Sequence, residues 1–195
     1  MDLFLAICQG LGLALAIGIG GALVALFVAA MASLEAGMDP DGTDFSFISE
    51  TWFLAILFAL VVLGLVSRGR AALRYPLLIL LSTTGALAFA ASLAEEGETA
   101  WPGLIVGALA TAVAAMIAAD ILEGAISRAK GSDKEGADAA VNTLVIGFSF
   151  GGILLAALSL FVPPVSLVAA FLLLALALGR RRKAGEKYEG LRILR

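Results

Sequence analysis

The sequence contains no histidine and a single cysteine, Cys8, among its 195 residues. The lack of histidine excludes His-based acid–base chemistry and the Ser–His and Cys–His pairs that activate nucleophiles. A single cysteine excludes a disulfide within the chain, and a zinc site of the usual type is not expected without histidine or further thiols. We therefore predict that the protein is not an enzyme and has no catalytic residues, no metal and no cofactor.

Charge is also scarce, because only 15% of the residues are charged, whereas 61% are hydrophobic and the mean hydropathy is +1.03. Soluble domains are about 45–50% apolar. The excess comes in almost uncharged blocks of about 18–25 residues, the length that crosses about 30 Å of hydrocarbon. This pattern predicts an all-α, polytopic bundle of transmembrane helices with no role in nucleic-acid binding.

Six segments are predicted to span the membrane. They are residues 3–31, 52–66, 75–93, 102–125, 141–161 and 165–178. Residues 1–183 then form one membrane domain, and residues 184–195 form a cytoplasmic basic tail. The first segment has no basic region before it, so we interpret it as a retained span rather than a signal peptide.

The distribution of charge predicts the orientation of these spans. If the N-terminus is cytoplasmic and the spans alternate, all 13 Lys and Arg residues fall on the inner side. The outer loops then carry only acids: Glu35, Asp39, Asp41, Asp44, Glu50, Glu95, Glu96 and Glu98. Because Lys and Arg resist translocation, we predict that both termini are cytoplasmic.

The six spans divide into halves of three, residues 1–94 and 101–183, which would have opposite orientations. Gly21-Ala22-Leu23 in the first span corresponds to Gly107-Ala108-Leu109 in the fourth, and Pro76 falls near the position of Pro163. Inverted repeats are a common plan in transporters. In a chain rich in Ala, Leu and Gly, however, such short matches also arise by chance, so both interpretations stay open.

Two acids, Asp120 and Glu123, lie at the inner end of the fourth predicted span. At about 1.5 Å per residue, a helix that begins at Pro102 reaches Asp120 after about 27 Å. An ionisable residue within a span usually faces the bundle interior and marks a pathway. The alternative is that both acids belong to a helix end that has reached water.

Glycine-rich stretches interrupt the first and fifth predicted spans. They contain Gly18, Gly20 and Gly21, and Gly147, Gly151 and Gly152 together with Ser149. One interpretation is close helix packing, since Gly10, Ala14, Gly18 and Ala22 recur every four residues. The other is a pair of broken helices that line a transport path, with Gln9 lining an inner vestibule.

Three hydroxyl residues, Ser82, Thr83 and Thr84, lie near the middle of the third predicted span. They either line a polar path or bond back to the preceding helical turn. The basic run Arg180, Arg181, Arg182 and Lys183 directly follows the last span. It is expected to anchor the topology and to contact anionic lipid headgroups on the cytoplasmic side.

The C-terminal sequence KYEGLRILR, after a span that opens with FVPP, resembles the end of a bacterial integral membrane family, domain of unknown function 4126. The resemblance implies a small multi-pass protein of the bacterial inner membrane and supplies no activity. Members of that family tend to carry an acidic pair after an asparagine in the fifth span. Here Asn142 is followed by Thr143 and apolar residues, so a function of that pair is in doubt for this chain.

Two functions follow from these features. The first is a transporter or channel for an ion or small solute, with its path between two inverted halves. The second is a non-catalytic accessory subunit, either as a homo-oligomer or within a larger membrane complex. An enzyme that acts on lipids is disfavoured, because the acids Asp133 and Asp138 sit in an ordinary polar loop.

Overall fold

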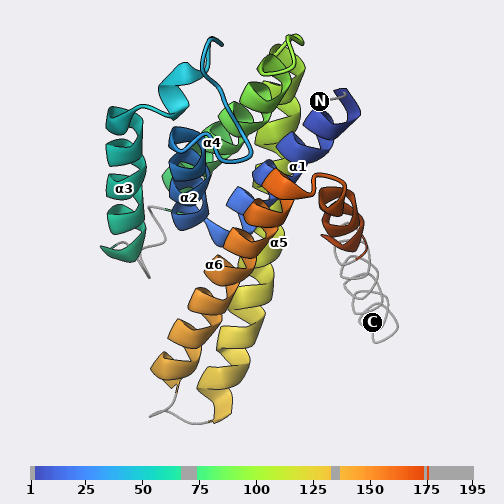
Figure 1. The fold of residues 1–195 in the computed structure, drawn as a ribbon. Coiled ribbons are helices and arrows are strands. Elements are labelled where there is room, and N and C mark those ends of the chain that lie inside the picture. Colours follow the sequence, from blue (N-terminus) through green and yellow to red (C-terminus); the bar gives the residue numbers. More distant parts are fainter. Residues whose placement is uncertain (1–2, 67–73, 133–136, 174, 176–195) are drawn as a thin grey trace.

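The structure is a computed structural model that describes residues 3–66, 74–132, 137–173 and 175. Within these residues the fold is all-helical and contains no strand. The elements are α1 (Leu3–Gly20), α2 (Ala22–Ser33), the short 3-10 helix η1 (Ser46–Ile48), α3 (Thr51–Val66), α4 (Arg74–Ala94), α5 (Trp101–Ser132) and α6 (Ala137–Phe161). Residues 165–173 are also helical, and Figure 1 shows the arrangement.

Four of the described helices, α1, α4, α5 and α6, are long and apolar enough to cross a membrane, whereas α2 and α3 are shorter apolar helices. The predicted spans at 52–66, 75–93, 102–125 and 141–161 coincide with α3, α4, the first part of α5 and most of α6. The sixth predicted span begins with the helical residues 165–173, and its remainder lies largely outside the described residues.

The first predicted span, residues 3–31, is wrong as a single helix, because it is divided at Gly21 into α1 and α2. Gly21 has φ 73° and ψ −153°, a backbone conformation that essentially only glycine adopts without strain. The sequence-based alternative of a helix broken within residues 18–21 is therefore confirmed. The four-residue repeat of small residues ends there, since Ala22 already belongs to α2.

The two N-terminal helices form a hairpin, and the loop after α2 returns to α1 at Gln9. Near the start of α1, the Gln9 side-chain amide donates a hydrogen bond to the Gly37 carbonyl oxygen, 2.6 Å away and just beyond α2. At the end of α2, the Ser33 hydroxyl donates to the Ser49 carbonyl oxygen at 2.7 Å. Figure 1 accordingly shows the chain descending obliquely in α1 and returning in α2.

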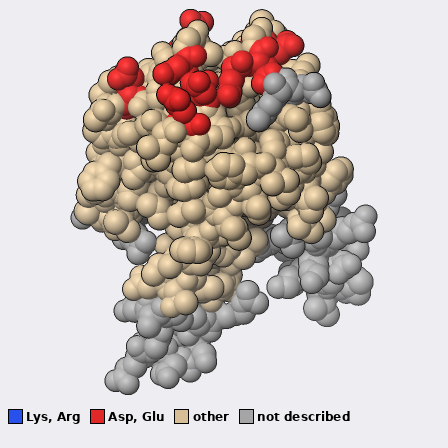
Figure 2. Space-filling model, viewed as in Figure 1, with Lys and Arg blue, Asp and Glu red and all other residues tan. Residues whose placement is uncertain are grey.

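The beginning of this hairpin lies at the end of the molecule that carries the acidic loops. Figure 2 shows the acids gathered along that end, and Figure 1 shows the N-terminal part of α1 close to it. The sequence-based arrangement had placed the N-terminus and the acidic loops at opposite ends. In the structure the two lie at the same end of the molecule, because the break at Gly21 turns the chain back.

α1 is the central helix of the bundle and packs against α4, α5 and α6. Its residues Leu13, Ala14 and Ala16 are completely buried. A methyl group on Gly18 would come within 2.5 Å of the Thr111 carbonyl oxygen, so α1 and α5 approach as closely as glycine allows. The buried Thr111 hydroxyl donates to the Ala14 carbonyl oxygen at 2.9 Å, which links the two helices directly.

α6 is continuous through its glycine-rich stretch, so the second predicted helix break is wrong. Gly152 instead faces α1, where an added methyl group would lie 2.8 Å from the Gly20 Cα atom and 3.0 Å from the Ala16 carbonyl oxygen. Gly147 and Gly151 face open space. The stretch stays helical because one of its glycines is needed for close approach and none has a positive φ.

The proposed internal repeat gains no support from its matched segments. Gly21 ends one helix and precedes another, whereas the corresponding Gly107 lies inside the uninterrupted helix α5. Gly107 packs closely against α4, where an added methyl group would lie 2.7 Å from the Gly85 carbonyl oxygen. The two glycines therefore have different structural roles, and the inverted repeat stays a prediction.

The contact between Gly20 and Gly152 predicts opposite effects for two neighbouring substitutions in α6. Gly152→Ala should lower the free energy of unfolding by about 1–3 kcal/mol, because the added methyl group overpacks the crossing with α1. Gly151→Ala should be neutral or stabilising by up to about 1 kcal/mol, since alanine favours helix and the site is open. Equal effects in detergent-solubilised protein, measured by chemical denaturation, would contradict the crossing.

Candidate functional site

A cavity of about 400 Å³ adjoins the break between α1 and α2. Its lining comes from the hairpin tip, the second half of α3 and the middle of α6: Gly20, Ala22, Leu23, Val61, Gly64, Leu65, Val145, Ile146, Ser149, Phe150 and Ile153. Among the described lining residues, which are mostly apolar, Ser149 has the one polar side chain. We refer to this space as the tip cavity.

The tip cavity lies at mid-depth in the bundle. Gly18, near the tip, packs against Thr111, about ten residues after Trp101 at the acid-bearing end. Gly20 packs against Gly152, about nine residues before the end of α6. At about 1.5 Å per helical residue, the contact with Thr111 places the tip about 15 Å from the acid-bearing end.

The first turn of α2 presents backbone donors at this depth. A helix leaves its first four N–H groups without intrahelical acceptors. The Val24 and Ala25 N–H groups donate to the Gly21 carbonyl oxygen at 3.1 and 3.2 Å. The Ala22 and Leu23 N–H groups have no acceptor within the described part of the chain, and both residues line the tip cavity.

Only some of the glycine and serine residues that were predicted as site residues lie at the tip cavity. Gly20 and Ser149 line the tip cavity, and Gly21 forms the break beside it. Gly18 and Gly152 lie in the helix contacts that hold the hairpin. Gly147 and Gly151 are exposed on α6 and do not line the cavity.

The two acids singled out in the sequence lie apart from this cavity. Asp120 and Glu123 are both exposed on α5. The buried face of α5 runs instead through Thr111, Ala114 and Ala118. Figure 1 shows α5 and α6 side by side and extending beyond the other labelled helices at the end opposite the acidic loops. This geometry favours the interpretation of a helix end.

Gln9 is enclosed within the protein, and its role in an inner vestibule stays a prediction. Its side chain is 1% exposed and is held by the hydrogen bond to the Gly37 carbonyl oxygen near the acid-bearing end. The reason is the reversed direction of α1, which places the first turns of the helix at the acidic side. Gln9 therefore fastens the chain after α2 to the beginning of α1.

The hydroxyl residues of α4 are mainly satisfied within their own helix. The Thr83 hydroxyl donates to the Ile79 carbonyl oxygen at 3.0 Å, and the Thr84 hydroxyl donates to the Leu81 carbonyl oxygen at 2.8 Å. Ser82, Thr83 and Thr84 do not line the tip cavity. These contacts agree with the bonding of hydroxyls to the preceding turn.

Sequence reasoning missed the contribution of α3 to the tip cavity. Val61 and Leu65 carry no polar group, so their place beside a backbone break could not be identified from residue type. The signal that was present is Gly64, the one glycine of α3. The basic residues Arg180–Lys183 and the tail 184–195 lie outside the described residues.

At the acid-bearing end, the loop after α2 is fastened to the end of α4. The Asp39 N–H group donates to a Glu95 carboxylate oxygen at 3.2 Å. Although the Glu95 side chain is exposed by surface area, partial desolvation by its neighbours raises the pKa of its carboxyl above the ordinary value. The hydrogen bond from Asp39 lowers this pKa, and the charges of Glu96 and Asp39 add to the increase. Glu95 thus lies where its ionised form is disfavoured.

We found no protein-family model, no curated protein and no solved structure that matches this chain. The resemblance based on the C-terminal sequence therefore stays a prediction.

The raised pKa of Glu95 predicts a pH dependence of stability. The free energy of unfolding should be highest below the ordinary carboxyl pKa and should fall as pH rises through the raised pKa of the folded state. Glu95→Gln keeps an oxygen that can accept from Asp39 and should reduce this fall. The measurement is the unfolding midpoint as a function of pH. Asp44→Asn is the control, and an equal reduction from it would contradict the assignment to Glu95.

Proposed function

We propose that this protein is a small multi-pass membrane transporter or channel that conducts an ion or small solute through the tip cavity. The observation that carries the proposal is the helix break at Gly21, which opens beside a cavity of about 400 Å³. Discontinuous helices that meet near the middle of the membrane are typical of transporter binding sites.

The physical argument rests on the backbone groups at the break. In hydrocarbon, each polar backbone group without a partner costs several kcal/mol, on the order of 2–7. Non-helical backbone is tolerated at membrane depth only inside protein or beside a water-filled cavity. The Ala22 and Leu23 N–H groups therefore favour water or a polar solute in the tip cavity.

We propose a topology in which α1 and α2 form a re-entrant hairpin that enters and leaves on the acidic, outer side. The helices α3, α4, α5 and α6 and the helix that begins at residue 165 then cross the membrane. This arrangement also keeps all 13 Lys and Arg residues on the inner side, where they can contact anionic headgroups. It has one crossing fewer than the sequence-based plan and an outer N-terminus.

The lining limits what can pass. Apart from Ser149 and backbone groups, the tip cavity offers apolar side chains such as Ile146 and Phe150. Such a path cannot replace the full hydration shell of a large polar solute. A small ion that keeps part of its water, or a small neutral or amphipathic solute, fits this chemistry better.

The proposal predicts a flux that a bulky side chain in the tip cavity blocks. Ile146→Trp should reduce flux of protons, monovalent ions or small neutral solutes into sealed liposomes by at least about tenfold, because the larger ring fills the path. Leu154→Trp is the matched control, because Leu154 lies on the same helix and is similarly exposed but does not line the tip cavity, and it should retain wild-type flux.

Asp120→Asn, measured in the same assay, should also retain flux, because Asp120 does not line the tip cavity. Loss of flux in Asp120→Asn with normal flux in Ile146→Trp would contradict this path. Absence of flux in the wild type across all of these solutes would instead support the accessory-subunit function.

A further inference from the structure

A second cavity, of about 310 Å³, lies at the acid-bearing end between the start of α1 and the turn from α4 to α5. Phe89 and Leu93 of α4 are buried and line it. Ile7 of α1 and Val106 of α5 line it as well and are each about half exposed. We refer to this space as the outer groove.

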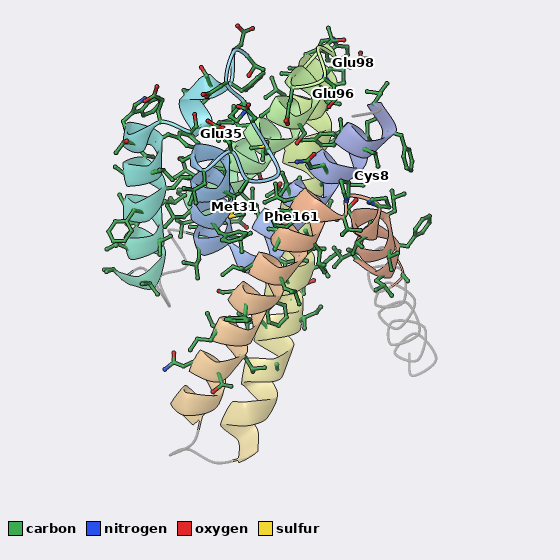
Figure 3. All side chains as sticks on the ribbon, in the orientation of Figure 1. Cys8, Met31, Glu35, Glu96, Glu98 and Phe161 are labelled. Carbon is green, nitrogen blue, oxygen red and sulfur yellow. The ribbon has the colours of Figure 1, made fainter. Side chains whose placement is uncertain are left out.

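Among the described residues that line the outer groove, the one charged side chain is the Glu98 carboxylate. Glu98 and Thr99, in the turn between α4 and α5, are its polar lining residues. Both are exposed, and Figure 3 shows Glu98 with Glu96 at the top of this turn. The segments 34–50 and 95–100 hold eight acids and no Lys or Arg, so no basic residue in these loops offsets the charge at Glu98.

The groove also lies at the expected boundary between hydrocarbon and water. Trp101, the first residue of α5, is 64% exposed directly beside Pro102, which lines the groove. Exposed tryptophans at helix ends are typical of the membrane interface. Molecules that carry an apolar body and a charged group concentrate at this depth.

We propose that the outer groove binds an amphipathic organic cation, with its apolar body against Phe89 and Leu93 and its cationic group beside the Glu98 carboxylate. The eight acids of the loops at this end disfavour an amphipathic anion of the same shape. The site lies at the opposite end of α1 from the tip cavity, so its binding can be measured independently of transport.

The test uses two probes of nearly equal shape and opposite charge, tetraphenylphosphonium and tetraphenylborate. Binding is followed by the fluorescence of Trp101 in full-length protein that carries Trp52→Phe, in detergent micelles. The phenylalanine keeps an aromatic ring against Phe47, whose ring centroid lies 6.0 Å from that of Trp52. The phosphonium should give a saturable change, and the borate should give none.

Variants then locate the site. Glu98→Gln should weaken phosphonium binding by about tenfold, the change that corresponds to about 1.4 kcal/mol. Val106→Phe should abolish saturable binding by filling the groove. Glu35→Gln, which removes an exposed acid beyond the end of α2 (Figure 3), should change the affinity by less than about twofold. Thermal unfolding midpoints within a few degrees of the wild type show that the variants are folded.

Three results would overturn the proposal. The first is equal binding of the phosphonium and the borate, which would reduce the groove to an apolar surface. The second is an affinity that neither Glu98→Gln nor Val106→Phe changes. The third is equal weakening by Glu98→Gln and Glu35→Gln, which would assign the effect to the general charge of the acid-bearing end.

Discussion

The backbone break at Gly21 is the constraint on which the rest of the structure depends. A chain that stops being helical inside hydrocarbon must be enclosed, because its free N–H and C=O groups find no partner in lipid. α1 lies at the centre of the bundle, against α4, α5 and α6, and the break at its end is half-buried beside the tip cavity. Close contacts at Gly18 and Gly20 hold the tip, and they need glycine on α1 and small residues opposite.

The hairpin also explains why the acid-bearing end is so closely connected. Both ends of the hairpin arrive there, so the chain after α2 lies beside the start of α1 and the end of α4. Gln9 holds Gly37, and Glu95 holds the Asp39 N–H group. The tip, by contrast, is held only by close packing and borders a cavity. One end of the hairpin is therefore fastened by polar contacts while the other faces open space.

Much of the helical architecture could be predicted from the sequence. The uncharged blocks correspond to α3, α4, α5 and α6 within a few residues, since length and hydropathy decide where such helices lie. The break within residues 18–21 was identified as one of two alternatives from glycine content alone. The direction of the chain after the break could not be predicted, because the first 34 residues contain no Lys or Arg to mark a side.

The candidate site was harder to predict than the helices. A glycine can end a helix or allow two helices to pack closely, and its residue type alone does not distinguish these roles. Gly21 breaks a helix, whereas Gly152 allows the close crossing of α6 with α1. Asp120 was a candidate because it is an acid at the end of an apolar run. In the structure α5 continues to Ser132, and Asp120 is exposed on its surface. The lining residues of α3 have no polar side chain that could have identified them as part of a site.

The re-entrant hairpin is tested most directly by determining the side of the membrane on which α1 begins. Single-cysteine variants Leu3→Cys, Asp44→Cys and Ser127→Cys, in a Cys8→Ala background, present exposed positions to a membrane-impermeant thiol reagent in intact and permeabilised cells. The account predicts that Leu3→Cys and Asp44→Cys react from the same side and Ser127→Cys from the other. Reaction of Leu3→Cys from the same side as Ser127→Cys would contradict it and restore a first helix that crosses the membrane.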